Sequence, residues 1–287
     1  MTSRILYGHR DARGKRRTPR ILIAVLGPAL ALVCAIVAAA ILSMPSLQIN
    51  EVAISGLATL DEAAVRERIG ARFSGDTFFR IPRSSYFLAD TETLGADLRA
   101  AFPVIAELHV DKSFPDGLTV AIREREFWAI MCNTLSRLET SSPSGRAASE
   151  NTAPQCVAID ETGFGYAPAP RPQGGLILTI ATDGTLLVPG KQEIPQALMR
   201  RLRIVRDGIT STTGLEVSGF ELRDRVPAEI RVRTADGFVV FFRAEEDDFA
   251  NALRVLKKVL DAEIGDRRAE LEYIDARFGN KAFYKMR

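Results

Sequence analysis

The clearest feature in the pattern of apolar and polar positions is an uncharged apolar stretch near the start of the chain. Residues 21–42 include no charged side chain. A helix of this length would span about 33 Å at roughly 1.5 Å per residue, close to the thickness of the hydrocarbon core of a bilayer. A buried helix of a soluble protein would need polar positions that this stretch lacks. We therefore expect one transmembrane helix over residues 21–43.

Downstream, the apolar positions change between the period of strands and the period of helices. A strand, two helices and two further strands are expected, at residues 47–54, 59–70, 90–102, 104–110 and 118–122. Thr59 followed by Glu62 has the form of a capping box, in which hydroxyl and carboxylate each satisfy a free backbone N–H. Pro103 ends the second helix. The predicted order is β-α-α-β-β.

The rest of the chain is predicted to be rich in strands, with two amphipathic helices. The main elements are expected at residues 195–209, 230–233, 238–242, 249–260 and 271–278. The dipeptide Asp236-Gly237 joins the second and third of these, which is typical of a β-hairpin. Residues 271–278 are the expected closing strand.

Charge is distributed unevenly, although the net charge is only +2. Seven of the first 20 residues are Lys or Arg, whereas residues 43–62 contain none. Because positively charged flanks stay inside, we expect a basic cytoplasmic tail at residues 1–20 and an extracytoplasmic region after Ser43. A basic tail alone would also suit nucleic acid, but the apolar stretch after it favours membrane lipid. A cleaved signal peptide is the alternative, although its apolar segment would cover only about 7 to 15 residues.

The cysteines fit an extracytoplasmic location. Cys34 falls in the apolar stretch, and Cys132 and Cys156 flank a Ser/Thr/Pro/Gly-rich loop at about residues 134–154. Thiols can be oxidised outside the cytoplasm. If the apolar runs beside the loop form a hairpin, Cys132 and Cys156 face each other and can form a disulfide. Two unpaired buried thiols are the alternative.

Signals for catalysis, metal binding and cofactor binding are lacking in the sequence. Of the two histidines, His9 falls in the expected tail and only His109 lies beyond the apolar stretch. The acidic run at residues 245–248 lacks the ligand spacing of an EF-hand loop, and no Gly-rich phosphate loop is present. We therefore expect no catalytic residue, no metal, no cofactor and no nucleic acid partner, but a protein that binds other proteins.

Several short motifs, taken in their order, resemble one known module. Gly56 after the first strand, Phe102-Pro103-Val104, Phe114-Pro115 and the run at residues 118–125 look like the POTRA module of FtsQ/DivIB cell-division proteins. The basic tail and the apolar stretch also agree with that family. The resemblance implies an α+β chain with a single N-terminal transmembrane helix and a POTRA domain at residues 47–125. A β-rich domain with flanking helices would follow at residues 126–287.

The resemblance also implies a function. Proteins of this family are non-catalytic scaffolds of the bacterial division machinery that recruit and link other division proteins at the septum of the inner membrane. Their partner, the FtsB/FtsL pair, binds through the closing strand. Matched residue by residue, this strand offers Tyr273, Arg277 and Phe278 as partner-binding residues, on a sheet edge over residues 271–285 that a partner strand can join. Tyr273 as a core residue is the alternative.

A second class of protein also uses POTRA modules. Chaperones and transport components for outer-membrane or exported proteins carry them, usually several together or beside a β-barrel. The single predicted module and the amphipathic helices after it agree better with the division family.

Overall fold

The computed structural model describes residues 18–76, 81–133, 155–183, 187–223, 228–246 and 248–287, with side chains from residue 26 onward. The chain forms two compact units. The first holds residues up to 54, 62–94 and 110–120, and the second holds residues 55–61, 95–109 and 121–287. Residues 1–17 of the expected tail and the expected loop at 134–154 lie outside the described residues.

Helix α1 (Thr18–Leu42) occupies the uncharged stretch, and a short 3-10 turn (Pro45–Leu47) follows it. Apart from Ala39 and Leu42, the side chains described on α1 are exposed. Among the described residues, no helix combines the length and the apolar character needed to cross a membrane.

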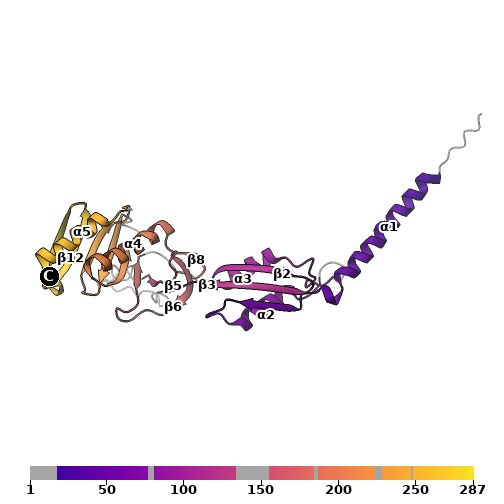
Figure 1. Cartoon of the computed structure of the whole chain (residues 1–287), viewed down its shortest axis with the longest axis horizontal. Coiled ribbons are helices and arrows are strands. Elements are labelled where there is room, and N and C mark those ends of the chain that lie inside the picture. Colours follow the sequence, from indigo (N-terminus) through magenta and orange to yellow (C-terminus); the bar gives the residue numbers. More distant parts are fainter. Residues whose placement is uncertain (1–17, 77–80, 134–154, 184–186, 224–227, 247) are drawn as a thin grey trace, which may run out of the picture. The chain divides into compact units, whose positions relative to one another are not determined.

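A small α+β arrangement follows α1. Its elements in chain order are β1 (Glu51–Ser55), α2 (Glu62–Phe73), α3 (Thr91–Ala101), β2 (Ile105–Ser113) and β3 (Gly117–Glu124). The strands form a three-stranded sheet in the order β1-β3-β2 (Figure 1). The predicted order of β-α-α-β-β is confirmed. The apolar faces of the helices are buried through Val65 and Ile69 in α2 and through Leu94 and Leu98 in α3.

The loop before α2 is held by a carboxylate from a distant strand, and not by the predicted capping box. Helix α2 begins at Glu62. The N–H groups of Ala58 and Leu60 donate to Glu124 at 2.7 and 3.0 Å, and Thr59 donates its N–H and its hydroxyl to the same carboxylate. Burial alone would raise the pKa of Glu124, but these hydrogen bonds lower it from 4.5 to about 2. Glu124 therefore fixes the entry to α2 as a carboxylate.

The second sheet has ten strands, in the order β13-β12-β11-β10-β9-β7-β4-β5-β6-β8. The bounds in chain order are β4 (Ala129–Cys132), β5 (Cys156–Ile159), β6 (Phe164–Ala169), β7 (Thr179–Thr182), β8 (Lys191–Gln192), β9 (Val217–Leu222), β10 (Glu229–Thr234), β11 (Val239–Arg243), β12 (Leu271–Phe278) and β13 (Lys281–Met286). The pairs β4–β7, β7–β9 and β11–β12 are parallel, and the other pairs are antiparallel. The predicted hairpin is confirmed as β10–β11, with Gly237 at φ 89° in its turn.

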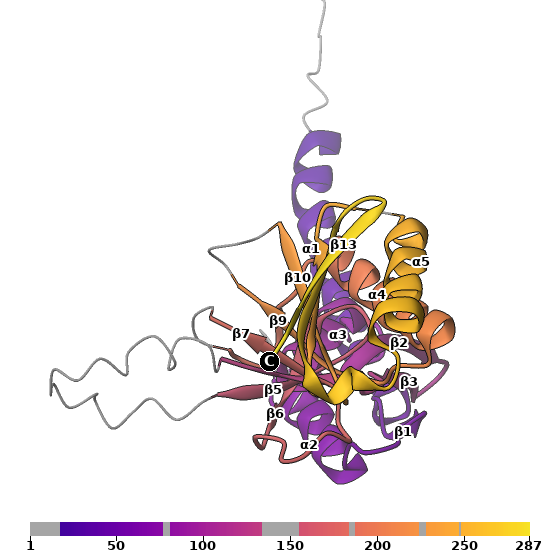
Figure 2. The same cartoon turned by 90° about the vertical axis from the view of Figure 1, so that its left-hand side faces the viewer.

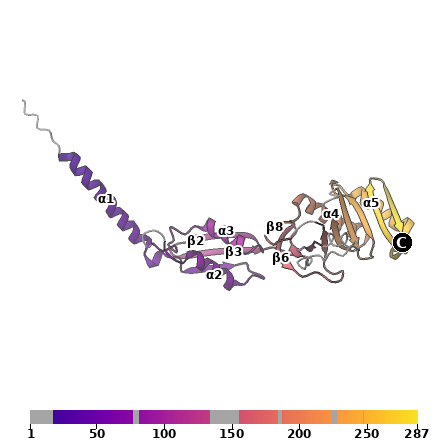
Figure 3. The same ribbon diagram turned by 180° about the vertical axis from the view of Figure 1, so that it is seen from behind.

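Two long helices cover one face of the ten-stranded sheet. Helices α4 (Gln196–Thr213) and α5 (Ala250–Val259) lie on the same side of its strands (Figure 2). Figure 3 shows them from behind, beside β8 and the C-terminal strands. A π-helical turn (Leu260–Ile264) and a 3-10 turn (Arg267–Glu270) lead from α5 into β12. The core between helices and sheet includes Leu202 and Leu256 from the helices and Phe220 and Phe242 from the sheet.

A smaller cluster lies on the other face. Successive residues of a strand point to opposite faces, so Ala129 and Met131 of β4 join the helix-covered core. Ile130 and Cys132 turn the other way, and with Cys156 they form a separate buried cluster. Cys132 and Cys156 are register partners in the β4–β5 pair and are joined by a disulfide bond.

Candidate partner-binding site at the sheet edge

The expected closing strand is a hairpin, and its second strand forms the edge of the sheet. Strand β12 lies between β11 and β13, so the edge expected over residues 271–285 is present only in its second part, and the expectation is wrong for residues 271–278. Gly279, at φ 67°, reverses the chain between β12 and β13. A residue with a side chain would be strained there, and this reversal explains why one expected strand became two. The edge is formed by β13.

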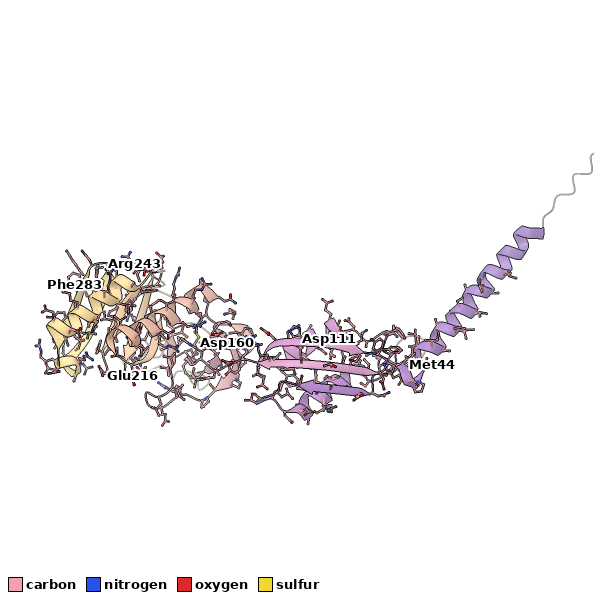
Figure 4. All side chains as sticks on the ribbon, viewed as in Figure 1. Met44, Asp111, Asp160, Glu216, Arg243 and Phe283 are labelled. Atoms are coloured by element: carbon pink, nitrogen blue, oxygen red, sulfur yellow. A yellow bond between two sulfur atoms is a disulfide. The ribbon has the colours of Figure 1, made fainter. Side chains whose placement is uncertain are left out.

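Strand β13 presents large aromatic side chains to solvent. Phe283 and Tyr284 are 56% and 40% exposed, and Phe278, at the end of β12, is 51% exposed. The rings of Phe278 and Phe283 meet edge to face with their centroids 5.1 Å apart. Figure 4 labels Phe283. Because Phe283 pairs with Asp275 and Tyr284 pairs with Ile274, these two aromatic residues project from opposite faces of the sheet.

Tyr273 lies inside the sheet and is half-buried. Its ring packs against Phe241 of β11 with centroids 5.6 Å apart, close to perpendicular. Its register partner on β13 is Lys285, so β13 separates its backbone from the free edge. Tyr273 therefore lies on the face of the sheet that α4 and α5 leave uncovered. There its contact with Phe241 stabilises the pairing of β11 with β12.

Arg277 is occupied by carboxylates of its own chain. Its guanidinium donates from Nε and Nη2 to Asp275 at 2.8 and 2.5 Å, and from Nη1 to Glu229. Arg231 donates to the same Glu229, whose side chain is only 6% exposed. Arg277, expected as a partner-binding residue, is therefore already paired within its own chain. The cause is a pair of acids on β10 and β12 whose proximity no local sequence pattern reveals.

Within this network, the pairing favours the charged forms of Asp275 and Arg277. Burial would raise the pKa of Asp275, but hydrogen bonds from the Arg277 side chain and backbone, together with the positive charge of Arg277, hold this pKa below its ordinary value. The same hydrogen bond raises the pKa of Arg277. The backbone oxygen of Arg277 accepts from Arg243 at 3.1 Å, and Asn251 of α5 donates to Gly279 at 2.9 Å. The hairpin turn is thereby tied to β11 and to α5.

The motif at residues 118–125 also has a structural explanation. Arg125, within the second unit, donates to Asp160 at 2.6 Å and to the backbone of Pro103 at 3.0 Å, and its guanidinium lies 3.8 Å from the ring centroid of Phe164. Burial would raise the pKa of Asp160, but hydrogen bonds from Thr162, Arg125 and backbone N–H groups lower it. The side chains of Glu124 and Arg125 thus both form hydrogen bonds within the chain.

The structure also allows a search for a metal site among the described residues. Among them, no group of three or more His, Cys, Asp or Glu residues is arranged to hold a metal ion. The residues that sequence reasoning missed are Phe283 and Tyr284 at the edge, and Glu229 and Phe241 beside it. The turn sequence Gly279-Asn280 was a local signal for the hairpin, but Glu229, the distant partner of Arg277, had none.

Comparison with known proteins bears directly on this fold. A family described as "POTRA domain, FtsQ-type" matches residues 47–125, which hold the three-stranded sheet and its two helices. A cell division protein FtsQ of Streptomyces coelicolor is 27% identical over 237 residues, covering 80% of this chain and 84% of that protein. The chain is therefore similar to FtsQ cell-division proteins over most of its length. A second FtsQ, from Streptomyces bingchenggensis, is 30% identical over 175 residues, covering 60% of this chain and 55% of that protein. The POTRA domain and the β-rich domain of an FtsQ-type chain are thus both present.

Proposed function

We propose that this protein is a membrane-anchored, non-catalytic scaffold of the bacterial division machinery that binds other division proteins along strand β13. The observation that carries the proposal is that, in the described part of the chain, β13 has a sheet neighbour on one side only. An extended segment of another protein can add to the other side as a further strand, because edge N–H and C=O groups are free to pair. The proposed role in cell division is supported by the two relatives, which are both named cell division protein FtsQ.

The proposed anchor is a single transmembrane helix over residues 21–43. It is supported by the lack of charge in residues 21–42 and by the exposed apolar side chains of α1, among them Leu30, Val33 and Val37. Such side chains on all sides of one helix suit lipid. We propose from the Lys/Arg bias that the tail lies in the cytoplasm and the rest of the chain outside it. The proposed location, the inner membrane of the division septum, is supported by the FtsQ relatives.

Protease treatment of spheroplasts tests the anchor. We expect digestion of the outer region down to a fragment that ends near residue 45, while the tail stays protected. Protection of the whole C-terminal region would contradict this orientation.

The proposed partner is an FtsB/FtsL-like pair, as the family resemblance implies. A partner strand on β13 would lie beside Phe283 on one face and Tyr284 on the other, and Phe278 would extend the first of these contacts. Aromatic residues that are exposed in the free protein are common anchors of interfaces. We propose that Tyr273 and Arg277 contribute by holding β12, and through it β13, in position.

Hydrogen exchange with and without the purified pair tests strand addition. Amides of residues 281–286 should gain protection in the complex, because a new strand accepts and donates along the edge. In a pull-down by the full chain in detergent, Phe283→Ala should weaken capture by about 2 kcal/mol, roughly thirtyfold. Phe127→Ala is the matched control, since Phe127 is also apolar and 53% exposed but lies before β4.

Two results would redirect the proposal. Unchanged capture and unchanged protection would move the partner site away from β13. Crosslinking in membranes to outer-membrane assembly components, in place of division proteins, would favour a POTRA-containing chaperone or transport component.

A further inference from the structure

A second group of exposed aromatic and apolar side chains lies in the first unit. Phe87 and Phe114 are 55% and 71% exposed, and Leu88 is 45% exposed. The ring of Tyr86 meets both phenyl rings edge to face, with centroid distances of 5.6 Å to Phe87 and 5.7 Å to Phe114. We name Tyr86, Phe87, Leu88 and Phe114 the aromatic tip. Neighbouring apolar side chains that stay in solvent point to a surface that something covers.

Backbone hydrogen bonds tie the aromatic tip to the first residues after α1. The N–H of Tyr86 donates to the oxygen of Leu47 at 2.8 Å. The N–H of Asn50 donates to Asp116 at 3.0 Å, two residues beyond Phe114. The two segments of the tip therefore meet the chain five and eight residues after the end of α1 at Leu42.

The connection between α1 and the tip is itself a series of hydrogen-bonded turns. Ser43 donates to Ala39 at 3.0 Å, Met44 to Ile41 at 3.2 Å and Leu47 to Met44 at 3.0 Å. Such turns advance about 1.5 to 2 Å per residue, so Leu42 and Leu47 are separated by on the order of 10 Å along the chain. Met44, labelled in Figure 4, lies in this connection and is 48% exposed.

We propose that the aromatic tip rests in the headgroup layer of the membrane that α1 crosses. This inference rests on the proposed membrane anchor. The headgroup layer is about 5 to 8 Å thick on each side. The connection from Leu42 to Leu47, on the order of 10 Å along the chain, is comparable with this thickness, so the tip can reach the layer. Tyr is favoured at this depth, where an apolar body and a polar surrounding coexist. Phe and Leu are among the residues that interfacial segments bury at the boundary of headgroups and acyl chains. The partner of this surface is therefore the phospholipid bilayer itself.

The charges near the tip suit zwitterionic as well as anionic lipid. Leu88 lines a hollow of about 260 Å³ together with Arg72, Arg83 and Asp90, among other residues. Guanidinium groups pair with lipid phosphates, which every phospholipid carries. The Asp90 carboxylate accepts from the hydroxyl and the N–H of Thr93, which lower the pKa of Asp90. Asp116 adds a negative charge, so anionic lipid is not required.

Depth measurement with nitroxide labels on the full chain in phosphatidylcholine nanodiscs tests the proposal. Labels are placed at Phe87→Cys, Phe114→Cys and Glu126→Cys, each in a Cys34→Ala background. Glu126 lies two residues beyond Glu124, where β3 ends, and β3 extends over about 23 Å from Gly117 to Glu124 at 3.3 Å per residue. Labels at 87 and 114 should collide more with oxygen than with a water-soluble nickel chelate, and the label at 126 should show the reverse.

Two further measurements separate the possible failures. A label on native Cys34 reports whether α1 is in the membrane. If Cys34 is shielded from nickel while labels at 87 and 114 are as accessible as the label at 126, the headgroup proposal is overturned and the anchor stands. If Cys34 is accessible, the anchor itself fails. A label at Leu88→Cys should lose its shielding in Phe87→Ser/Phe114→Ser and keep it in Phe127→Ser; equal shielding in both would also overturn the proposal.

Discussion

The ring of Phe278 meets the ring of Phe283 edge to face across the last turn of the ten-stranded sheet, with their centroids 5.1 Å apart. Both side chains remain more than half exposed, at 51% and 56%. A contact between two rings that solvent still reaches contributes modestly to folding, and it leaves most of both surfaces available to a partner.

We expect the two rings to be weakly coupled in folding and jointly required in binding. Phe278→Ala, Phe283→Ala and the double variant should give a coupling energy of about 1 kcal/mol in urea unfolding of the purified chain. Each single variant should weaken capture of the FtsB/FtsL-like pair by about 2 kcal/mol. Variants that bind less only in proportion to their lost stability would argue against a direct contact.

Removing the guanidinium of Arg277 should destabilise the β-rich domain more than removing an exposed one. Arg277→Met leaves the buried carboxylate of Glu229 short of a cation, and we expect a loss of about 2 kcal/mol in the free energy of unfolding. Arg66→Met is the matched control, since Arg66 and Glu62 are 51% and 56% exposed, and it should cost under about 1 kcal/mol. Equal losses in the two variants would show that the Arg277 network is merely a surface pair.

Acid should destabilise the chain through Glu124. Its pKa is about 2 in the folded chain against an ordinary 4.5, so folding is favoured by the carboxylate above pH 4.5. Between pH 4.5 and about 2, the unfolded chain takes up a proton on Glu124 that the folded chain does not. The contribution is therefore lost as the pH falls through about 2. Glu124→Gln should cost about 2 kcal/mol at pH 7 and little at pH 2 in urea unfolding. A cost that stays constant over this range would exclude the carboxylate as its source.

The disulfide between Cys132 and Cys156 should stabilise the chain by closing a loop. The two residues are 24 apart in sequence, and for such a loop the expected contribution is about 3 kcal/mol. Cys132→Ser/Cys156→Ser should lose this amount in unfolding without reductant. Mass spectrometry of a non-reduced digest provides the direct check, and two separately alkylated peptides would refute the bond.

The sequence predicted those elements whose cause is local. The periods of apolar residues in α3 and α4 and the Asp236-Gly237 turn each specify a helix or a hairpin from neighbouring residues alone. The order of the ten strands was not accessible in this way, because β4 pairs in parallel with β7 and β11 with β12 across intervening segments.

The same distinction explains the site. Thr59 and Glu62 matched a capping box, but the carboxylate that the loop uses comes from Glu124, 65 residues after Thr59. Arg277 was expected to bind a partner protein, and its pairing with Glu229 was not foreseen because Glu229 lies 48 residues earlier. Phe278 was expected at the edge of the sheet. The chain reverses at Gly279, however, so β13 forms the edge and Phe278 lies at the end of the neighbouring strand β12.

The register of β4 and β5 has a practical consequence for engineering. Because Cys132 and Cys156 are paired, their Cα atoms, which flank the segment 133–155, are held 4.2 Å apart. A fluorescent reporter whose own termini are close together could be spliced between them without stretching either strand. A protease cut anywhere in that segment would leave both pieces covalently joined until a reductant is added.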